Sequence, residues 1–364
     1  MKKISHIWMR WQDMVFLYYF LFLPLYIITV FYGVCIKLRF FLYRIGFFKI
    51  RKLDCKVISI GNITVGGSGK TPMAIYLAEK LKEKGREIVI LSRGYKGKVK
   101  DIGVVSDGEN ILLGPEDAGD EPYLMATKLK TVPVIVGRDR YVAGLYAVEK
   151  FNPDIIILDD AFQHIRLARD IDILLIDGRR GFGNGRLFPL GILREYLNGL
   201  KRASLFMVKG VNTPFPPDNP PLSLFGRGGG FNAPLVSFHY KPKTLLSMVD
   251  DSRLNIDILK GKRIIALSGI ADPKSFKDTL EGLGAVIVKE ISYPDHYCYT
   301  SDDLNHLADE AKGTDMVVVT EKDGVKLKRF SIKSLTVYAL EIGIEMRDKD
   351  SEIFFTGLRD YSVA

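Results

Sequence analysis

VISIGNITVGGSGKTP, residues 57–72, is a short apolar run that leads into a glycine-rich loop and then into a helix-like stretch up to Lys84. A buried strand, a glycine loop and a helix in this order predict a phosphate-binding loop within an α/β fold. Glycine lets the backbone wrap closely around phosphate groups, so that N–H groups and the helix N-terminus point at the anion. The stretch therefore predicts binding of ATP or GTP.

The side chains at the end of this loop suit phosphate and metal binding. Lys70 can reach the β- and γ-phosphates of a nucleotide, and the Thr71 hydroxyl can bind Mg²⁺. The general pattern G-x-x-x-x-G-K-[ST] has glycine at its first position, where this chain has Thr64. The expected nucleotide-binding residues are Thr64, Val65, Gly66, Gly67, Ser68, Gly69, Lys70 and Thr71.

Two other classes of P-loop protein share parts of this pattern. Partitioning ATPases have a lysine just before the paired glycines, and Val65 occupies that position here. A GTPase would need an N-K-x-D string for guanine, and the residues TEKD at 320–323 are in the wrong order for it. A membrane-tethered ATPase of the partitioning or assembly type is the alternative that we keep.

A second strand-like segment, DIIILDD at residues 154–160, ends in two acids. In nucleotide-binding folds an acid at the end of a strand holds Mg²⁺ directly or through water. Ligands also gather at the carboxyl ends of parallel strands. We therefore expect Asp159 and Asp160 to face the metal, although surface acids that cap the following turn are the plainer alternative.

Several arginines follow strand-like segments or glycine-rich stretches, where guanidinium groups can hold phosphate or offset charge during its transfer. These are Arg93, Arg138, Arg140 and Arg194. Each alone is more often part of a surface salt bridge. Arg194 lies in a long, glycine-rich and unusually apolar loop, residues 183–195, and loops of that length in compact domains tend to be functional.

Apolar runs alternate with helical stretches along most of the chain, which predicts an α/β fold with a parallel sheet. We expect a membrane helix with a basic interfacial segment in residues 1–52 and a P-loop domain in residues 53–210. A Pro- and Gly-rich linker in residues 211–233 then leads to a smaller α/β domain in residues 234–364.

The net charge of +9 is concentrated at the N-terminus. Residues 1–52 contain nine Lys or Arg and one acid, Asp13, whereas the rest of the chain carries 43 basic and 42 acidic residues. A nucleic-acid enzyme usually spreads basic groups over its catalytic body. The distribution therefore argues against a nucleic-acid partner and for an anionic membrane.

Residues 14–36 form an uncharged apolar run of 23 residues. At about 1.5 Å per residue, a helix of this length covers a hydrocarbon core of about 30 Å. A signal peptide would be shorter and followed by an A-x-A-like site, and a buried core helix is the other alternative. Three basic residues precede the run and six follow it before Asp54, which predicts a cytoplasmic location for the bulk of the protein.

Two further loops carry acidic or imidazole groups whose role the residues alone leave open. GDEP at 119–122 has the composition of an ordinary helix start. YPDH at 293–296 places His296 on a loop, where a structural histidine is the default interpretation. The same ambiguity applies to His164 in DDAFQH. Asp120 and His296 lie 176 positions apart, so that sequence spacing says nothing of a contact between them.

Taken together, these strings resemble the tetraacyldisaccharide 4′-kinase family of lipid A biosynthesis, in order and over almost the whole chain. The matching strings are GNITVGGSGKTP (61–72), SRGY (92–95), GDEP (119–122), DDAFQH (159–164), the loop 183–195, SGIADP (268–273), PDH (294–296) and TEKD (320–323). Ala161 and Gly324 stand where the family often has glycine and alanine, and neither is a proposed chemical group.

The resemblance implies an enzyme that uses ATP and Mg²⁺ to phosphorylate the 4′-hydroxyl of a tetraacylated glucosamine disaccharide 1-phosphate. The reaction would take place at the cytoplasmic face of a Gram-negative inner membrane. Asp120 would be the base that takes the proton of the sugar hydroxyl, and His296 would lie beside it and orient it. The other implied site residues are Lys70 and Thr71 for the phosphates and Mg²⁺, Asp159 and Asp160 for the metal, and Arg93 and Arg194 for phosphate or lipid headgroup contacts.

Overall fold

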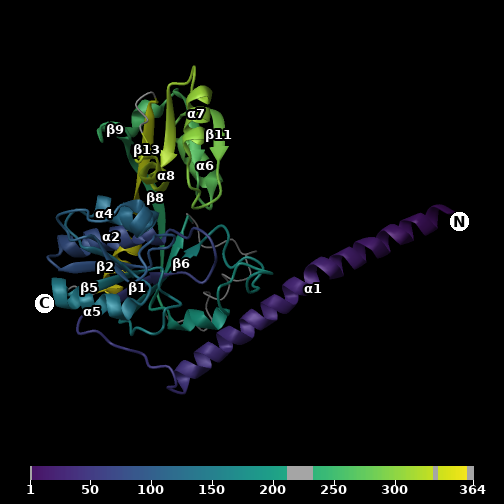
Figure 1. The fold of residues 1–364 in the computed structure, drawn as a ribbon, viewed down its shortest axis with the longest axis horizontal. Coiled ribbons are helices and arrows are strands. Elements are labelled where there is room, and N and C mark those ends of the chain that lie inside the picture. The colour runs from purple at the N-terminus through teal and green to yellow at the C-terminus, as the bar shows by residue number, and fades with distance from the viewer. Residues whose placement is uncertain (1, 211–232, 331–334, 359–364) are drawn as a thin grey trace.

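A single mixed sheet runs through both lobes of the molecule (Figure 1). The computed structural model describes residues 2–210, 233–330 and 335–358, with side chains from Phe22 onward. Within these residues the sheet has 13 strands, in the order β11-β10-β12-β13-β8-β7-β6-β1-β5-β2-β4-β3, and β9 pairs with β8 off this path. Most neighbours are parallel; β3–β4, β8–β9 and β8–β13 are antiparallel. The predicted α/β fold is confirmed.

The larger lobe contains the phosphate loop and the paired acids. Its strands are β1 (Lys56–Gly61), β2 (Ile88–Ser92), β3 (Ile102–Ser106), β4 (Val134–Gly137), β5 (Ile155–Asp159), β6 (Ile171–Asp177) and β7 (Leu205–Lys209). Its helices are α2 (Lys70–Glu83), α3 (Pro115–Ala118), α4 (Asp120–Lys128), α5 (Arg140–Phe151) and the 3₁₀ helix η1 (Leu197–Arg202). The strand–loop–helix order predicted around residues 57–72 is present as β1 and α2.

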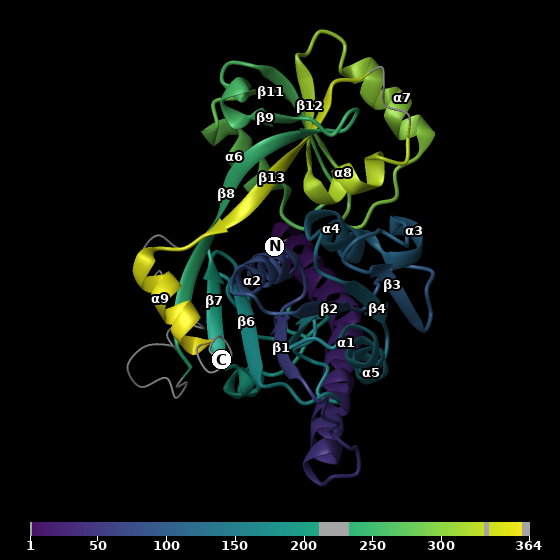
Figure 2. The same ribbon diagram turned by 90° about the vertical axis from the view of Figure 1, so that its left-hand side faces the viewer.

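The rest of the chain builds the smaller lobe and then returns to the larger one. The strands are β8 (Leu235–Ser247), β9 (Arg253–Asn255), β10 (Arg263–Ser268), β11 (Val286–Ser292), β12 (Met316–Thr320) and β13 (Val337–Glu345). The helices are η3 (Ile256–Leu259), α6 (Pro273–Gly282), α7 (Ser301–Glu310), α8 (Glu321–Leu327) and α9 (Asp348–Gly357). In Figure 2, β8 and β13 run together from the smaller lobe down to the larger one, where α9 lies beside β8.

Strand β8 belongs to both lobes. Its first residues pair in parallel with β7, and its later residues pair with β13 in antiparallel fashion. Phe354 of α9 is buried in the same core as the residues of α2 and β1. The linker expected at residues 211–233 lies outside the described residues except for Ala233. The division of the chain into domains at that linker stays a prediction.

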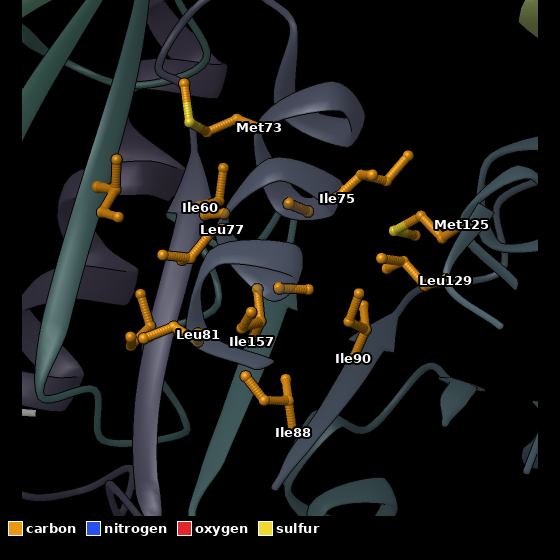
Figure 3. Packing of buried hydrophobic residues seen from close by; sticks show 14 of the residues in the cluster. Ile60, Met73, Ile75, Leu77, Leu81, Ile88, Ile90, Met125, Leu129 and Ile157 are labelled. Carbon is orange, nitrogen blue, oxygen red and sulfur yellow. The ribbon is translucent and has the colours of Figure 1, made fainter. Parts of the chain in front are cut away.

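The main core of the larger lobe lies between α2 and the sheet. Figure 3 shows Met73, Leu77 and Leu81 on one side of α2, pointing toward side chains of β1, β5 and β2. The spacing of four residues puts these three side chains on one face of the helix, and all three are buried. Burial of a side chain of this size contributes about 1.5–3 kcal/mol. This packing fixes the N-terminus of α2, and with it Lys70 and Thr71, at the carboxyl end of β1.

Helix α1 (Lys2–Arg44) extends away from the body (Figure 1). Its segment Phe22–Arg44 is long and apolar enough to cross a membrane, with a mean hydropathy of 1.8. Tyr32 and Ile36 pack against a core of the larger lobe, whereas Phe31 is 70 % exposed. The N-terminal apolar helix predicted from the sequence is therefore present, and its last turns are attached to the larger lobe.

Candidate active site

A cleft of about 820 Å³ lies between the two lobes. The loops that follow β1, β2, β4 and β5 line it, which places it at the carboxyl ends of the parallel strands, where ligands gather in such sheets. The predicted site residues that line it are Gly66, Gly67, Ser68, Gly69, Lys70, Thr71, Arg93, Asp160, Arg194 and His296. Thr64, Val65, Asp120 and Asp159 are not among the lining residues.

The phosphate loop turns into α2 at Gly69, which has a left-handed φ of 89°. A Cβ atom at this position would collide with the hydroxyl group of Tyr240 from β8. Lys70 is the first residue of α2, and its Nζ lies 3.6 Å from Asp160 Oδ1 and 3.5 Å from Asn62 Oδ1. The loop thus presents backbone N–H groups, a helix N-terminus and one cation to the cleft, as phosphate binding requires.

Thr64 and Val65 contact the loop 183–195. The N–H of Val65 donates a hydrogen bond to the carbonyl oxygen of Ile192 at 2.8 Å, and Thr64 pairs with Leu193 across a short antiparallel bridge. These contacts attach the start of the phosphate loop to the loop 183–195, a role that sequence spacing did not predict. Binding of nucleotide by these two residues stays a prediction.

Asp159 ends β5 and is 1 % exposed. Its Oδ2 accepts a hydrogen bond from the Ser92 hydroxyl at 3.3 Å, whereas its Oδ1 has no hydrogen-bond partner among the described residues. Burial, together with the nearby carboxylates of Glu121 and Asp160, raises the pKa of Asp159 well above its ordinary value. A cation near Oδ1 would offset the repulsion between these carboxylates and give the unpaired oxygen a partner.

Asp160 has the opposite environment. Both of its carboxylate oxygens accept from Arg194 Nη1, at 3.0 and 3.1 Å. Burial alone would raise the pKa of Asp160, but Lys70 and Arg194 outweigh it and hold the pKa below its ordinary value. The pKa values of the two neighbouring acids are therefore shifted in opposite directions. Arg194, which we expected to contact phosphate or the lipid headgroup, binds Asp160 in this structure.

This donor set fits Mg²⁺. The described residues contain no cluster of three or more His, Cys, Asp or Glu side chains that could hold a metal ion. Mg²⁺ in nucleotide sites needs fewer protein ligands, because phosphate oxygens and water complete its shell. The unpaired oxygen of Asp159 is the observation in the structure that agrees best with a bound cation.

The structure brings Asp120 and His296 together from different lobes. Asp120 begins α4 and His296 lies in the loop after β11, with 3.8 Å between Oδ2 and Nδ1. Lys326 Nζ of α8 is also 3.8 Å from Asp120 Oδ2. The His296 backbone has a left-handed φ of 60°, and its carbonyl oxygen accepts from Lys96 Nζ at 2.9 Å. Tertiary packing thus joins two motifs that sequence spacing could not connect.

Several side chains in the cleft were not predicted as site residues. Arg39 of α1 lines the cleft, and its Nη2 donates to the carbonyl oxygen of Gln163 at 2.9 Å. Glu121 and Lys322 also line the cleft and lie 3.2 Å apart. The string GDEP contained Glu121, but only its neighbour Asp120 was assigned a role, and no residue of the string TEKD, which contains Lys322, was assigned one. No motif in the sequence pointed to Arg39 as a site residue, and only its place in the basic segment after the apolar run drew attention to it.

Known proteins similar to this chain belong to one kinase family. The family model described as Tetraacyldisaccharide-1-P 4'-kinase matches residues 21–358. A tetraacyldisaccharide 4'-kinase of Desulfatibacillum aliphaticivorans is 42% identical over 335 residues, which cover 88% of this chain and 87% of that protein. The one of Halothermothrix orenii is 41% identical over 334 residues, with 87% of each chain covered.

A solved structure is similar over nearly the whole chain. It is described as the "apo" form of LpxK from Aquifex aeolicus in complex with ATP. The two chains are 35% identical with a TM-score of 0.73, and the match covers 93% of this chain and 99% of that one. On its motifs, its fold and these matches, the chain belongs to the tetraacyldisaccharide-1-P 4'-kinase family.

Proposed function

We propose that this protein is an ATP-dependent kinase that phosphorylates the 4′-hydroxyl of a tetraacylated glucosamine disaccharide 1-phosphate in lipid A biosynthesis. One observation carries the proposal: the phosphate loop, Asp160, His296 and Arg39 of the apolar helix all line one cleft. A nucleotide site and a membrane anchor therefore share one opening, which suits transfer of phosphate from a soluble donor to a lipid. The names of the relatives support the same substrate.

ATP would bind with its phosphates on the loop Gly66–Thr71, at the N-terminus of α2. Its β- and γ-phosphates would compete with Asp160 for Lys70, which is 3.6 Å from that acid. Thr71, Asp159 and Asp160 would hold Mg²⁺, whose charge offsets that of the phosphates when it is bound. Asp159 has the buried unpaired oxygen that this role needs.

The acceptor hydroxyl would lose its proton to Asp120. The 4′-oxygen forms a bond to the γ-phosphorus, the bond from that phosphorus to the β–γ bridging oxygen breaks, and ADP leaves with that electron pair. His296, 3.8 Å from Asp120, would orient the carboxylate. Phosphoryl transfer depends mainly on in-line placement and charge neutralisation. Arg93 and Arg194, both at the cleft, would contribute to that neutralisation or hold the lipid headgroup.

The protein would work at the cytoplasmic face of the inner membrane, anchored by α1. The basic residues that follow the apolar run favour this orientation, and anionic lipid, with no nucleic acid, would be its partner surface. We also propose that residues 53–210 and 234–364 act as two domains. The strands β8 and β13 connect their lobes, and α9 anchors the C-terminal end to the larger one.

A phosphate-transfer assay tests the proposal. Detergent-solubilised protein is given ATP labelled in its γ-phosphate, Mg²⁺ and tetraacyldisaccharide 1-phosphate, and the lipids are separated by thin-layer chromatography. We expect a labelled lipid with phosphate at the 4′ position, and none with Lys70→Met or Asp120→Asn. Label found only as free phosphate, while a control kinase works in the same mixture, would favour the membrane-tethered ATPase of the partitioning or assembly type.

A further inference from the structure

Lys322 lies beside His296 and has an acceptor for each of the three hydrogens of its ammonium group. Its Nζ is 3.0 Å from Asp295 Oδ1, 3.2 Å from Glu121 Oε1 and 3.2 Å from His296 Nε2. The side chain is 15 % exposed and comes from the first turn of α8. Glu121 belongs to the larger lobe and the other two acceptors to the loop after β11, so this lysine joins both lobes at His296.

The chemistry of an ammonium group fixes the direction of the hydrogen bond to the imidazole. Burial lowers the pKa of Lys322, but the carboxylates of Glu121 and Asp295 outweigh it and bring the pKa above its ordinary value. The group therefore stays protonated, with three N–H donors and no lone pair. Nε2 of His296 can then only accept, and a nitrogen that accepts carries no proton.

In a neutral imidazole the proton must then lie on the other nitrogen, Nδ1. Nδ1 is the atom that faces Asp120, at 3.8 Å from Oδ2. This distance is longer than a hydrogen bond of about 2.9 Å, and catalytic hydrogen bonds often tighten when substrate is bound. An N–H aimed at Oδ2 would hold one oxygen of Asp120 and leave the other free to take the substrate proton.

We propose that Lys322 is a positioning residue: its ammonium group fixes His296 as the neutral tautomer with the proton on Nδ1 and directs that proton at Asp120. This inference rests on the proposed roles of Asp120 as the base and His296 as its partner. The cation acts on Asp120 through the imidazole.

The tautomer can be observed directly. ¹⁵N NMR of protein labelled in histidine, at alkaline pH, distinguishes a pyridine-type from a pyrrole-type nitrogen, and His296→Ala identifies the signals of this ring among the five histidines. We expect a pyridine-type Nε2 in the unsubstituted protein, and proton gain at Nε2 in Lys322→Met. The other histidine signals report whether the variant keeps its fold.

Lys128→Met is the matched control for the spectra. Lys128 of α4 forms an ion pair with Glu321 of α8, so its loss also removes a contact between the lobes, but it does not touch His296. We expect this variant to retain the Nδ1–H tautomer. A proton on Nε2 in the unsubstituted protein, or an unchanged tautomer in Lys322→Met, would overturn the proposal.

A double-mutant cycle tests whether Lys322 acts through His296. Lys322→Met should lower kcat on the order of tenfold or more, within the contribution of a positioned acid–base group, and leave the KM for ATP nearly unchanged. In a His296→Ala background the same substitution should have no further effect. An equal loss in both backgrounds would refute the proposal. If the unsubstituted protein phosphorylates no lipid, the proposed function fails, whereas the spectra still decide the role of Lys322.

Discussion

Gly69 is the position in the phosphate loop where a side chain would meet the most severe obstacle. Its φ is 89°, and a Cβ there would collide with the Tyr240 hydroxyl and lie 3.2 Å from Cζ of the same ring. Gly85, in the turn after α2, has a similar φ of 79° but nothing within 4 Å of its Cβ position. The pair of glycines therefore separates the backbone effect of an added methyl group from its steric effect.

The expected losses of unfolding free energy follow from these surroundings. Gly85→Ala should cost about 1–2 kcal/mol, from the left-handed backbone alone. Gly69→Ala should cost the same plus about 1–3 kcal/mol for the forced contact. Tyr240→Phe removes only the hydroxyl oxygen, so that combining it with Gly69→Ala should recover part of the steric loss but none of the backbone loss.

Urea denaturation measures these differences. The unfolding is followed by circular dichroism and not by tryptophan fluorescence, because both tryptophans lie at the N-terminal end of α1, far along the chain from the loop. The slope of the free energy against urea must stay constant for the midpoints to be compared. Affinity for ATP should fall in Gly69→Ala and recover partly in the double variant. Equal destabilisation by Gly69→Ala and Gly85→Ala, or no recovery with Tyr240→Phe, would refute the view that Tyr240 confines this loop.

Three further outcomes are expected. Arg194→Met should lower kcat on the order of 100-fold, because it removes a charge-assisted pair with Asp160 at the proposed site of phosphoryl transfer. Initial rates at saturating ATP measure this change in kcat. In metal-free protein, raising the pH from 5 to 7 should destabilise the unsubstituted chain relative to Asp159→Asn. The pKa of Asp159 is raised in the folded state, so the folded state binds more protons in this range than the unfolded state does. The free energy of unfolding therefore falls as the pH rises, until the pH passes the folded pKa. Urea midpoints at each pH test the sign. Leu77→Ala should cost about 2–5 kcal/mol of unfolding free energy by the same denaturation assay, because the side chain of Leu77 is fully buried between α2 and the sheet.

The parts of the site that could be predicted are those that local sequence determines. The residues of β1, the phosphate loop and α2 are contiguous, so that hydrophobic pattern, glycine content and helix start all act within a few residues. The same holds for Asp159 and Asp160 at the end of β5. For these elements no tertiary contact is needed to assign the strand, the loop or the end of the sheet at which they lie.

The parts that could not be predicted depend on contacts between distant segments. The meeting of Asp120 with His296 requires the smaller lobe to pack over α4, and no periodicity within either loop encodes that. Arg39 reaches the cleft only because the last turns of α1 pack on the larger lobe. The return of α9 to the larger lobe likewise follows from the pairing of β13 with the shared strand β8.

The contacts that hold the lobes together around the cleft are mainly polar. Charged pairs that link the two lobes are Lys322–Glu121, Lys128–Glu321, Arg329–Glu116 and Arg179–Asp278. Among the described residues, no buried apolar cluster combines strands β1–β7 with β9–β12. Arg329–Glu116 and Arg179–Asp278 are well exposed, and such pairs are worth only about 0–1 kcal/mol each. Lys322–Glu121 and Lys128–Glu321 are largely buried. The lobes are therefore joined by the continuous strand β8 and, at the cleft, by polar contacts of which two are largely buried. Because Asp120 and His296 come from opposite sides of that polar contact, the proposed base and its partner are aligned only while the lobes stay together. A polar interface of this kind therefore makes catalytic competence depend on lobe position, whereas the phosphate loop, built within one lobe, does not need it.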